Sequence, residues 1–84
     1  MKLLYCSRCR DVIRIEVRSS CRCKKTKGRY LDNRNAEFEG EFAVPLGIDN
    51  AEFVRAVRAK DNERPISFRA FRMEDPCPTF RRKT

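Results

Sequence analysis

The sequence contains no histidine and no tryptophan, and only three of its 84 residues are glycine. Without histidine, the chain cannot build imidazole metal ligands, a Ser-His-Asp triad or imidazole acid–base catalysis. No hydrophobic run approaches the roughly 18 residues of a transmembrane helix. We therefore expect a soluble, cytosolic protein without a membrane partner, and the five cysteines become the first feature to explain.

Length and composition favour one small folded domain. Hydrophobic residues make up 40% of the chain and charged residues 38%, with six phenylalanines and two tyrosines. This hydrophobic content supports a small core and argues against wholesale disorder. Because a chain this short buries only a modest fraction of its surface, such domains often add a metal ion or disulfides.

Charge is unevenly distributed along the sequence, whose formal net charge is +8. Residues 1–30 carry ten basic and two acidic side chains, residues 31–63 carry four and eight, and residues 64–84 carry six and two. Two interpretations are open. Either the basic and acidic parts pair in the fold, or the basic N-terminal part presents a positive surface to a partner.

Four cysteines form two closely spaced pairs, a C-x2-C at Cys6 and Cys9 and a C-x-C at Cys21 and Cys23. Tetrahedral zinc with Zn–S bonds near 2.3 Å needs sulfurs roughly 3.8 Å apart, and both pair types can converge in this way. In a reducing cytosol such pairs are more often metal ligands than disulfides. We predict one structural Zn²⁺ bound by four thiolates, with two disulfides or redox thiols as alternatives.

The segment between the two pairs is compatible with this prediction. Residues 11–18 alternate between hydrophobic and charged side chains, which predicts a half-buried strand, and residues 19–20 predict a turn. A return strand would then bring Cys21 and Cys23 beside the first pair. Cys77 stands alone between two prolines, and we expect it to be a packed or free thiol.

The rest of the sequence predicts short strands and one helix. Strands are expected at 1–5, 28–31, 36–44 and 66–72, the third either continuous or kinked at Gly40 and closed by Pro45 and Gly47. The helix is expected at 49–60. Asp49 can cap it, Glu52 has the capping-box spacing, and an apolar face follows at Phe53, Val54 and Val57.

The predicted fold is α+β, with a small zinc-ribbon-like head on an antiparallel β-sheet and one α-helix. Residues 1–73 would form a single zinc-bound domain whose ribbon head spans residues 1–31. Residues 74–84, with Arg81, Arg82 and Lys83 near their end, would form a basic C-terminal tail.

The two cysteine pairs resemble a zinc ribbon. The chain is also similar to a set of small bacterial and phage proteins with no assigned activity, through the motifs Cys21-x-Cys23…Gly28-x-Tyr30-x-Asp32-Asn33, Ala43-Val44-Pro45-Leu46-Gly47-Ile48 and Cys77-Pro78-Thr79-Phe80. The resemblance implies a compact domain with a metal-bound head. Ribbon knuckles typically have glycine after the second cysteine, where it eases the turn. Arg10 and Lys24 occupy those positions here, so we expect at least one knuckle to be looser or differently shaped.

Basic side chains and an aromatic surround the second cysteine pair: Arg22, Lys24, Lys25, Lys27, Arg29 and Tyr30. Such a group can bind phosphates and stack a base, although nearby cations also offset the negative charge of a zinc–tetrathiolate unit. We predict a non-catalytic module that binds nucleic acid through this basic, zinc-stabilised hairpin.

The alternative is a protein-interaction module, such as a small phage or bacterial regulator of a host protein. Its contact surface would be the helix together with the acidic strand that carries Glu37, Glu39 and Glu41. An enzyme with a small-molecule substrate is not expected. The sequence has no P-loop and no G-x-S-x-G motif, and four cysteine ligands leave no open coordination position for water.

Overall fold

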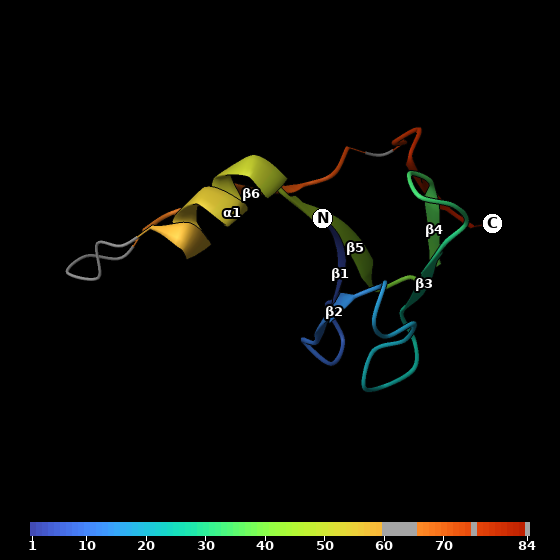
Figure 1. Ribbon diagram of the computed structural model, residues 1–84. Helices are drawn as coiled ribbons and strands as arrows, with labels where there is room; N and C mark the ends of the chain where they lie inside the picture. The colour runs from blue at the N-terminus through green and yellow to red at the C-terminus, as the bar shows by residue number, and fades with distance from the viewer. Residues whose placement is uncertain (60–65, 75, 84) are drawn as a thin grey trace.

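The computed structural model describes residues 1–59, 66–74 and 76–83. In these residues the chain forms two sheets and a single helix (Figure 1). The elements in chain order are β1 (Lys2–Cys6), β2 (Val12–Arg14), β3 (Lys27–Tyr30), β4 (Ala36–Glu39), β5 (Ala43–Ile48), α1 (Asn50–Arg58), β6 (Ala70–Arg72) and β7 (Phe80–Arg82). This is the predicted α+β class.

The larger sheet has the strand order β2-β1-β5-β6, and the smaller sheet has the order β3-β4-β7. Strand neighbours are antiparallel, except that β4 and β7 run parallel. We call β3-β4-β7 the small sheet. β1 pairs with β5 over five residues from Lys2 to Cys6, so the strand that supplies the first cysteine is also a central strand of the larger sheet.

The core is formed by side chains from both sheets. Leu4 of β1 and Ile13 of β2 are buried together with Phe38 of β4 and Phe80 of β7. The two phenylalanine rings pack edge to face with centroids 5.0 Å apart, a favoured aromatic geometry. Gly28 lets β3 approach closely, because a Cβ there would lie 2.6 Å from Leu4 Cδ1.

Residues 36–44 form two strands separated at Gly40, the second of the two predicted forms. Gly40 has a φ of +119°, and a Cβ at this position would collide with the backbone carbonyl of Lys25. Glycine therefore allows the chain to turn tightly against the second cysteine pair and to pass from the small sheet into β5 of the larger one.

The prediction that Pro45 and Gly47 close this strand is wrong, because both lie inside β5. Pro45 lacks an N–H, but the ladder to β1 does not need one at this position. Its carbonyl accepts a hydrogen bond from Met73 N–H at 2.9 Å, on the β6 side. In an antiparallel strand, the N and C=O of one residue point to the same side. The Pro45 nitrogen therefore faces the end of β6, beyond the last residue that pairs with β5, where no N–H is needed.

The predicted strand at 11–18 is shorter than expected. Only Val12–Arg14 pair with β1, and the chain then turns because the N–H groups of Val17 and Arg18 both donate to the Arg14 carbonyl. Ile15 remains buried after this turn, whereas Val17 is 75% exposed. The alternating pattern thus identified Ile13 and Ile15 as inward-facing correctly, but it was wrong for Val17 and overestimated the length of the strand.

Helix α1 begins as predicted. The Asp49 side chain accepts a hydrogen bond from Glu52 N–H at 3.0 Å and caps the helix. Its apolar face does not reach the core, since no residue of α1 is buried. Phe53 instead packs edge to face on Phe68, with centroids 5.0 Å apart. Among the described residues, no helix is long and apolar enough to cross a membrane.

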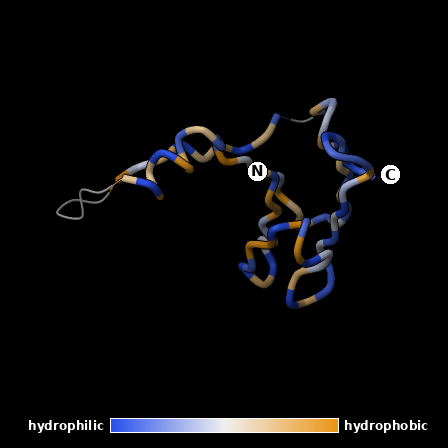
Figure 2. Tube along the Cα trace, viewed as in Figure 1, coloured by the Kyte–Doolittle hydropathy of each residue, from blue (hydrophilic) through white to orange (hydrophobic). Residues whose placement is uncertain are grey.

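We call α1 and residues 66–72 the arm, because α1 extends from the β5–β6 edge of the larger sheet away from the core (Figure 1). Hydrophobic residues occur along its length (Figure 2), and Val54, Val57, Phe68 and Phe71 are exposed. The predicted return strand at 66–72 is confined to Ala70–Arg72, which pair with β5 as β6.

The C-terminal residues differ from the predicted tail. Phe80–Arg82 form β7, and Phe80 is only 1% exposed. The Arg82 guanidinium lies 4.7 Å from the centroid of the Phe38 ring and donates to the carbonyls of Gly40 and Ala43 at 2.7 and 3.2 Å. The end of the chain therefore completes the small sheet and fastens the turn that connects the two sheets.

Candidate metal centre

Four cysteine sulfurs meet at one end of the core. The Sγ atoms of Cys6, Cys9, Cys21 and Cys23 all lie within 4.8 Å of one another, which confirms the predicted convergence. The Cys6–Cys23 and Cys21–Cys23 sulfur separations are 3.7 and 3.5 Å. These distances are close to the roughly 3.8 Å expected around tetrahedral zinc and far from the disulfide length of about 2.05 Å. All five cysteines are free thiols.

Each cysteine pair is held by a short turn that we call a knuckle. In the first, Arg10 N–H donates to the Cys6 carbonyl at 2.7 Å. In the second, Lys24 N–H donates to the Cys21 carbonyl at 3.1 Å, and Cys21 N–H donates to the Thr26 carbonyl at 2.9 Å. The hydrogen bond that closes the turn therefore spans four residues, Cys6 to Arg10, in the first knuckle and three, Cys21 to Lys24, in the second.

The residue after each pair adopts the left-handed conformation that glycine normally provides. Arg10 has a φ of 60° and Lys24 a φ of 67°, and they are the non-glycine residues with positive φ in the described chain. Both knuckles thus close without glycine, and they differ in shape, as one of the two predicted alternatives stated. An L-residue in this conformation costs about 1–2 kcal/mol, so each knuckle carries local strain.

Asp11 connects the two knuckles. Its carboxylate accepts hydrogen bonds from the Arg18 guanidinium at 2.8 Å and from the backbone N–H of Arg22, next to Cys21, at 3.0 Å. Burial opposes ionisation of Asp11, but these bonds outweigh it, so the pKa of the carboxyl group lies below its ordinary value. The carboxylate thus ties the chain after the first pair to the second pair.

The four thiols do not ionise equally in the absence of a cation. Burial disfavours the Cys21 thiolate, but the Thr26 N–H and the neighbouring thiols lower its pKa to about 6. At Cys23 the Lys25 N–H favours ionisation, but burial and the three adjacent sulfurs raise its pKa to about 11. Four negative charges at this spacing repel one another, so complete ionisation requires a bound cation.

The buried hydroxyl of Thr26 lies beside the thiol cluster and favours ionisation of Cys6. Thr26 Oγ1 is buried and has no hydrogen-bond partner within the described part of the chain. Burial raises the pKa of Cys6, but the Thr26 hydroxyl and the N–H groups of Cys9 and Arg8 lower it below the ordinary value overall. An ionised Cys6 beside Thr26 would give this hydroxyl an acceptor. The donor set, spacing and burial together suit a closed four-thiolate metal site.

The structure separates the predicted nucleic-acid-binding residues into two groups. Arg22, Lys24 and Lys25 are exposed on the second knuckle. The others lie on β3, where Arg29 Nε is 2.8 Å from Glu37 Oε1 and the half-buried Tyr30 ring lies 5.4 Å from Lys2 Nζ. Lys27, also on β3, lies opposite Glu39 in the strand register.

The first knuckle adds two exposed cations that the sequence analysis missed. Arg8 lies 6.0 Å from the Phe42 ring centroid, and Arg10 occupies the strained position already described. The repeated pattern of a basic residue after each cysteine pair could have revealed Arg10. Because the four sulfurs converge, both knuckles lie at the same end of the molecule (Figure 1). We call their five exposed cations the knuckle surface: Arg8, Arg10, Arg22, Lys24 and Lys25.

Cys77 lies outside the metal-ligand cluster. It is 8% exposed within the core, and its Sγ is 3.7 Å from Thr79 Oγ1. This is the packed, free thiol that the sequence predicted.

Comparisons of the chain with protein-family models, curated proteins and solved structures find no match. The function is therefore argued from the residues of this chain alone.

The strained knuckle residue gives a stability prediction. We expect Arg10→Gly to stabilise the metal-loaded fold by about 1 kcal/mol, because glycine adopts the left-handed conformation without strain. Arg10→Ala removes the same charge but keeps the strain, so it should leave stability nearly unchanged. Chemical denaturation of the three proteins measures the difference, and equal stability of the Gly and Ala variants would show that the turn is not strained.

Proposed function

We propose that the chain is a zinc-binding, non-catalytic module that binds nucleic acid through the knuckle surface. The observation that carries this proposal is the identity of the residues at the two left-handed positions. Glycine would relieve strain there, yet both positions hold an exposed cation, Arg10 and Lys24. Backbone strain retained at such positions is typical of residues kept for function.

Zinc is the metal that best suits four thiolates in a tetrahedral, closed arrangement. Cys6, Cys9, Cys21 and Cys23 would hold one ion with no coordination position left for water or substrate, so its role would be structural. Bound zinc would offset the repulsion between the thiolates and fix both knuckles, where the small core cannot do so alone.

Charge counting distinguishes a surface for a partner from cations that serve only to neutralise the metal site. A zinc–tetrathiolate unit carries about −2, whereas the knuckle surface carries five cations. The nearby Asp11 carboxylate is already paired with Arg18. About three positive charges therefore exceed what the site needs, and phosphates are the ligands that such an excess attracts most strongly.

Metal removal should unfold the knuckle end of the protein. We expect a strong chelator to lower the melting temperature and to expose all four ligand thiols to alkylation, because four thiolates repel one another without a bound cation. Cys6→Ser should also lower the melting temperature and expose the three remaining ligand thiols. Cys77→Ser is the matched control and should leave the zinc content at one ion per chain. An unchanged melting curve after complete metal removal would contradict the structural role of the ion.

Oligonucleotide binding across a salt series tests the nucleic-acid proposal. Replacing Lys24 and Lys25 with Gln should reduce the log–log salt slope by about 1.4 for a single strand, since each phosphate contact contributes about 0.7. Arg55→Gln with Arg58→Gln makes the same charge change on the arm and should leave the slope unchanged. If the two double variants lose affinity equally, net charge rather than the knuckle surface governs binding.

A protein partner is the second candidate, and the arm is the observation that favours it. Val54, Val57, Phe68 and Phe71 are exposed there, and Arg55, Arg58 and Arg72 form no salt bridge within the described part of the chain. These residues suit an apolar partner surface with an acidic rim. The acidic strand contributes less than the sequence predicted, because Glu37 is paired with Arg29. Absence of oligonucleotide binding at low salt would favour this second candidate.

A further inference from the structure

The outer face of the small sheet carries alternating rows of charge. Gly28, Phe38 and Phe80 point towards the core, so the residues between and beside them point outward. Lys27 on β3 lies opposite Glu39 on the central strand β4. On the other side of β4, Lys83 directly follows β7, and its N–H donates to the Phe38 carbonyl.

A second row runs parallel to the first. Arg29 is paired with Glu37, which in turn lies beside Arg81 in the parallel register of β4 and β7. The Arg81 Nε atom donates to the Pro78 carbonyl at 3.1 Å. In both rows one carboxylate on the middle strand lies between basic residues on the two outer strands. The face therefore has a net positive charge.

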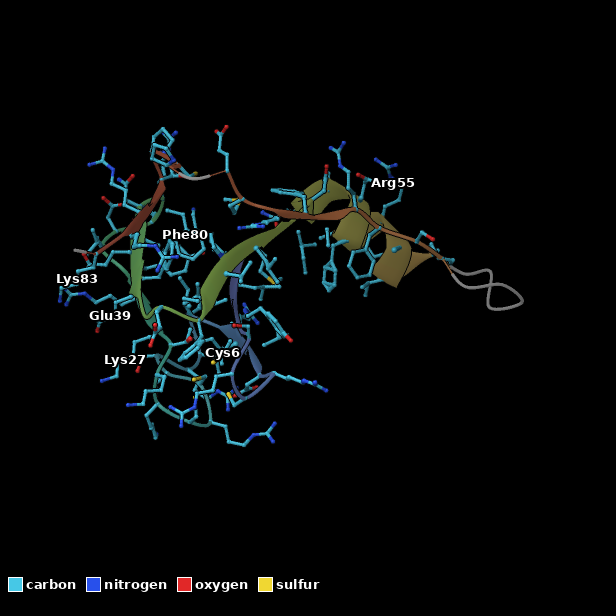
Figure 3. All side chains as sticks on the ribbon, turned by 180° about the vertical axis from the view of Figure 1, so that it is seen from behind. Cys6, Lys27, Glu39, Arg55, Phe80 and Lys83 are labelled. Carbon is cyan, nitrogen blue, oxygen red and sulfur yellow. The ribbon has the colours of Figure 1, made fainter. Side chains whose placement is uncertain are left out.

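A shallow groove of about 240 Å³ runs along this face, and its lining includes Lys27, Arg29, Glu39 and Lys83. Figure 3 shows Lys83, Glu39 and Lys27 following one another along one side of the molecule towards Cys6, with Arg55 far away on the arm. No salt bridge to Lys27, Glu39 or Lys83 occurs among residues 1–59, 66–74 and 76–83. Both ammonium groups are therefore available to an anionic ligand.

The groove is continuous with the knuckle surface. Lys27 comes two residues after Lys25, and the start of β3 is held beside the second knuckle by a 2.9 Å hydrogen bond from Gly28 N–H to the Ser19 carbonyl. The outer strands β3 and β7 lie two strand spacings apart, about 10 Å. That width suits a single nucleic-acid strand better than a duplex. Positively charged grooves that follow one backbone are characteristic of single-strand binding.

We propose that a single nucleic-acid strand bound at the knuckle surface continues across the outer face of the small sheet, with Lys27 and Lys83 as phosphate contacts. In this arrangement Glu39, between the two lysines, repels the phosphates and lowers the affinity. This inference rests on the proposed function and extends its binding site to the C-terminal strand.

The experiment uses the full zinc-loaded chain and a single-stranded oligonucleotide of about 16 nucleotides, the upper end of single-strand site sizes. Lys27→Gln and Lys83→Gln should each reduce the salt slope by about 0.7 and weaken binding about fivefold at low salt. Glu39→Gln should tighten binding about threefold, because it removes a like charge near the phosphates. Arg55→Gln is the control for net charge and should change neither quantity.

The outcomes separate this inference from the proposed function. If the wild-type protein binds no oligonucleotide at low salt, the proposed function fails and this inference fails with it. If the Lys24 and Lys25 variants weaken binding but those at Lys27, Lys83 and Glu39 do not, only the extension across the small sheet is wrong. Polyglutamate serves as a second probe. Loss of polyglutamate binding in the two lysine variants, with oligonucleotide binding intact, would assign the groove to an acidic protein segment and overturn the inference.

Discussion

Four cysteine sulfurs within 4.8 Å of one another impose the main constraint on this structure. As thiolates they repel one another unless a cation is bound between them. Cys6 ends β1, the strand that pairs with β5 over five residues. Cys21 and Cys23 precede β3, the first strand of the small sheet. Whatever holds the sulfurs together therefore also holds the two sheets in place, and the core between them is completed by Phe38 and Phe80.

The spacing of the cysteines and the hydrophobic alternation made much of this architecture predictable. Both are local signals, as is the capping pattern at Asp49, and together they indicated the sulfur cluster, β1, β3 and the start of α1 correctly. The strand predicted at 11–18 was too long because of a local turn at Arg14, but two other errors involve contacts between distant segments. Pro45 is accepted inside β5 because its nitrogen faces the end of β6, and Phe80 becomes a core residue because β7 pairs with β4. A single sequence gives no direct sign of such pairings.

The four cysteine ligands of the candidate site could be predicted from the sequence. The exposed basic residues around them could be predicted only in part. Arg29 belongs to the basic run, yet the strand register places it against Glu37. Arg10 was noted only for standing where glycine is usual, because its place among the exposed knuckle cations depends on how the two cysteine pairs converge in the fold. The first interpretation of the uneven charge, pairing within the fold, thus applies only in part. Part of the acidic segment is neutralised within the small sheet, while the knuckles keep their positive charge exposed.

Zinc K-edge X-ray absorption on the purified protein tests the proposed zinc site, because it reports the identity, number and distance of the atoms around the ion. We expect one zinc ion per chain with four sulfur neighbours at about 2.3 Å and no nitrogen or oxygen ligand. A first shell with fewer than four sulfurs, or with oxygen atoms from water, would contradict the claim that both knuckles are fixed by one closed four-thiolate site.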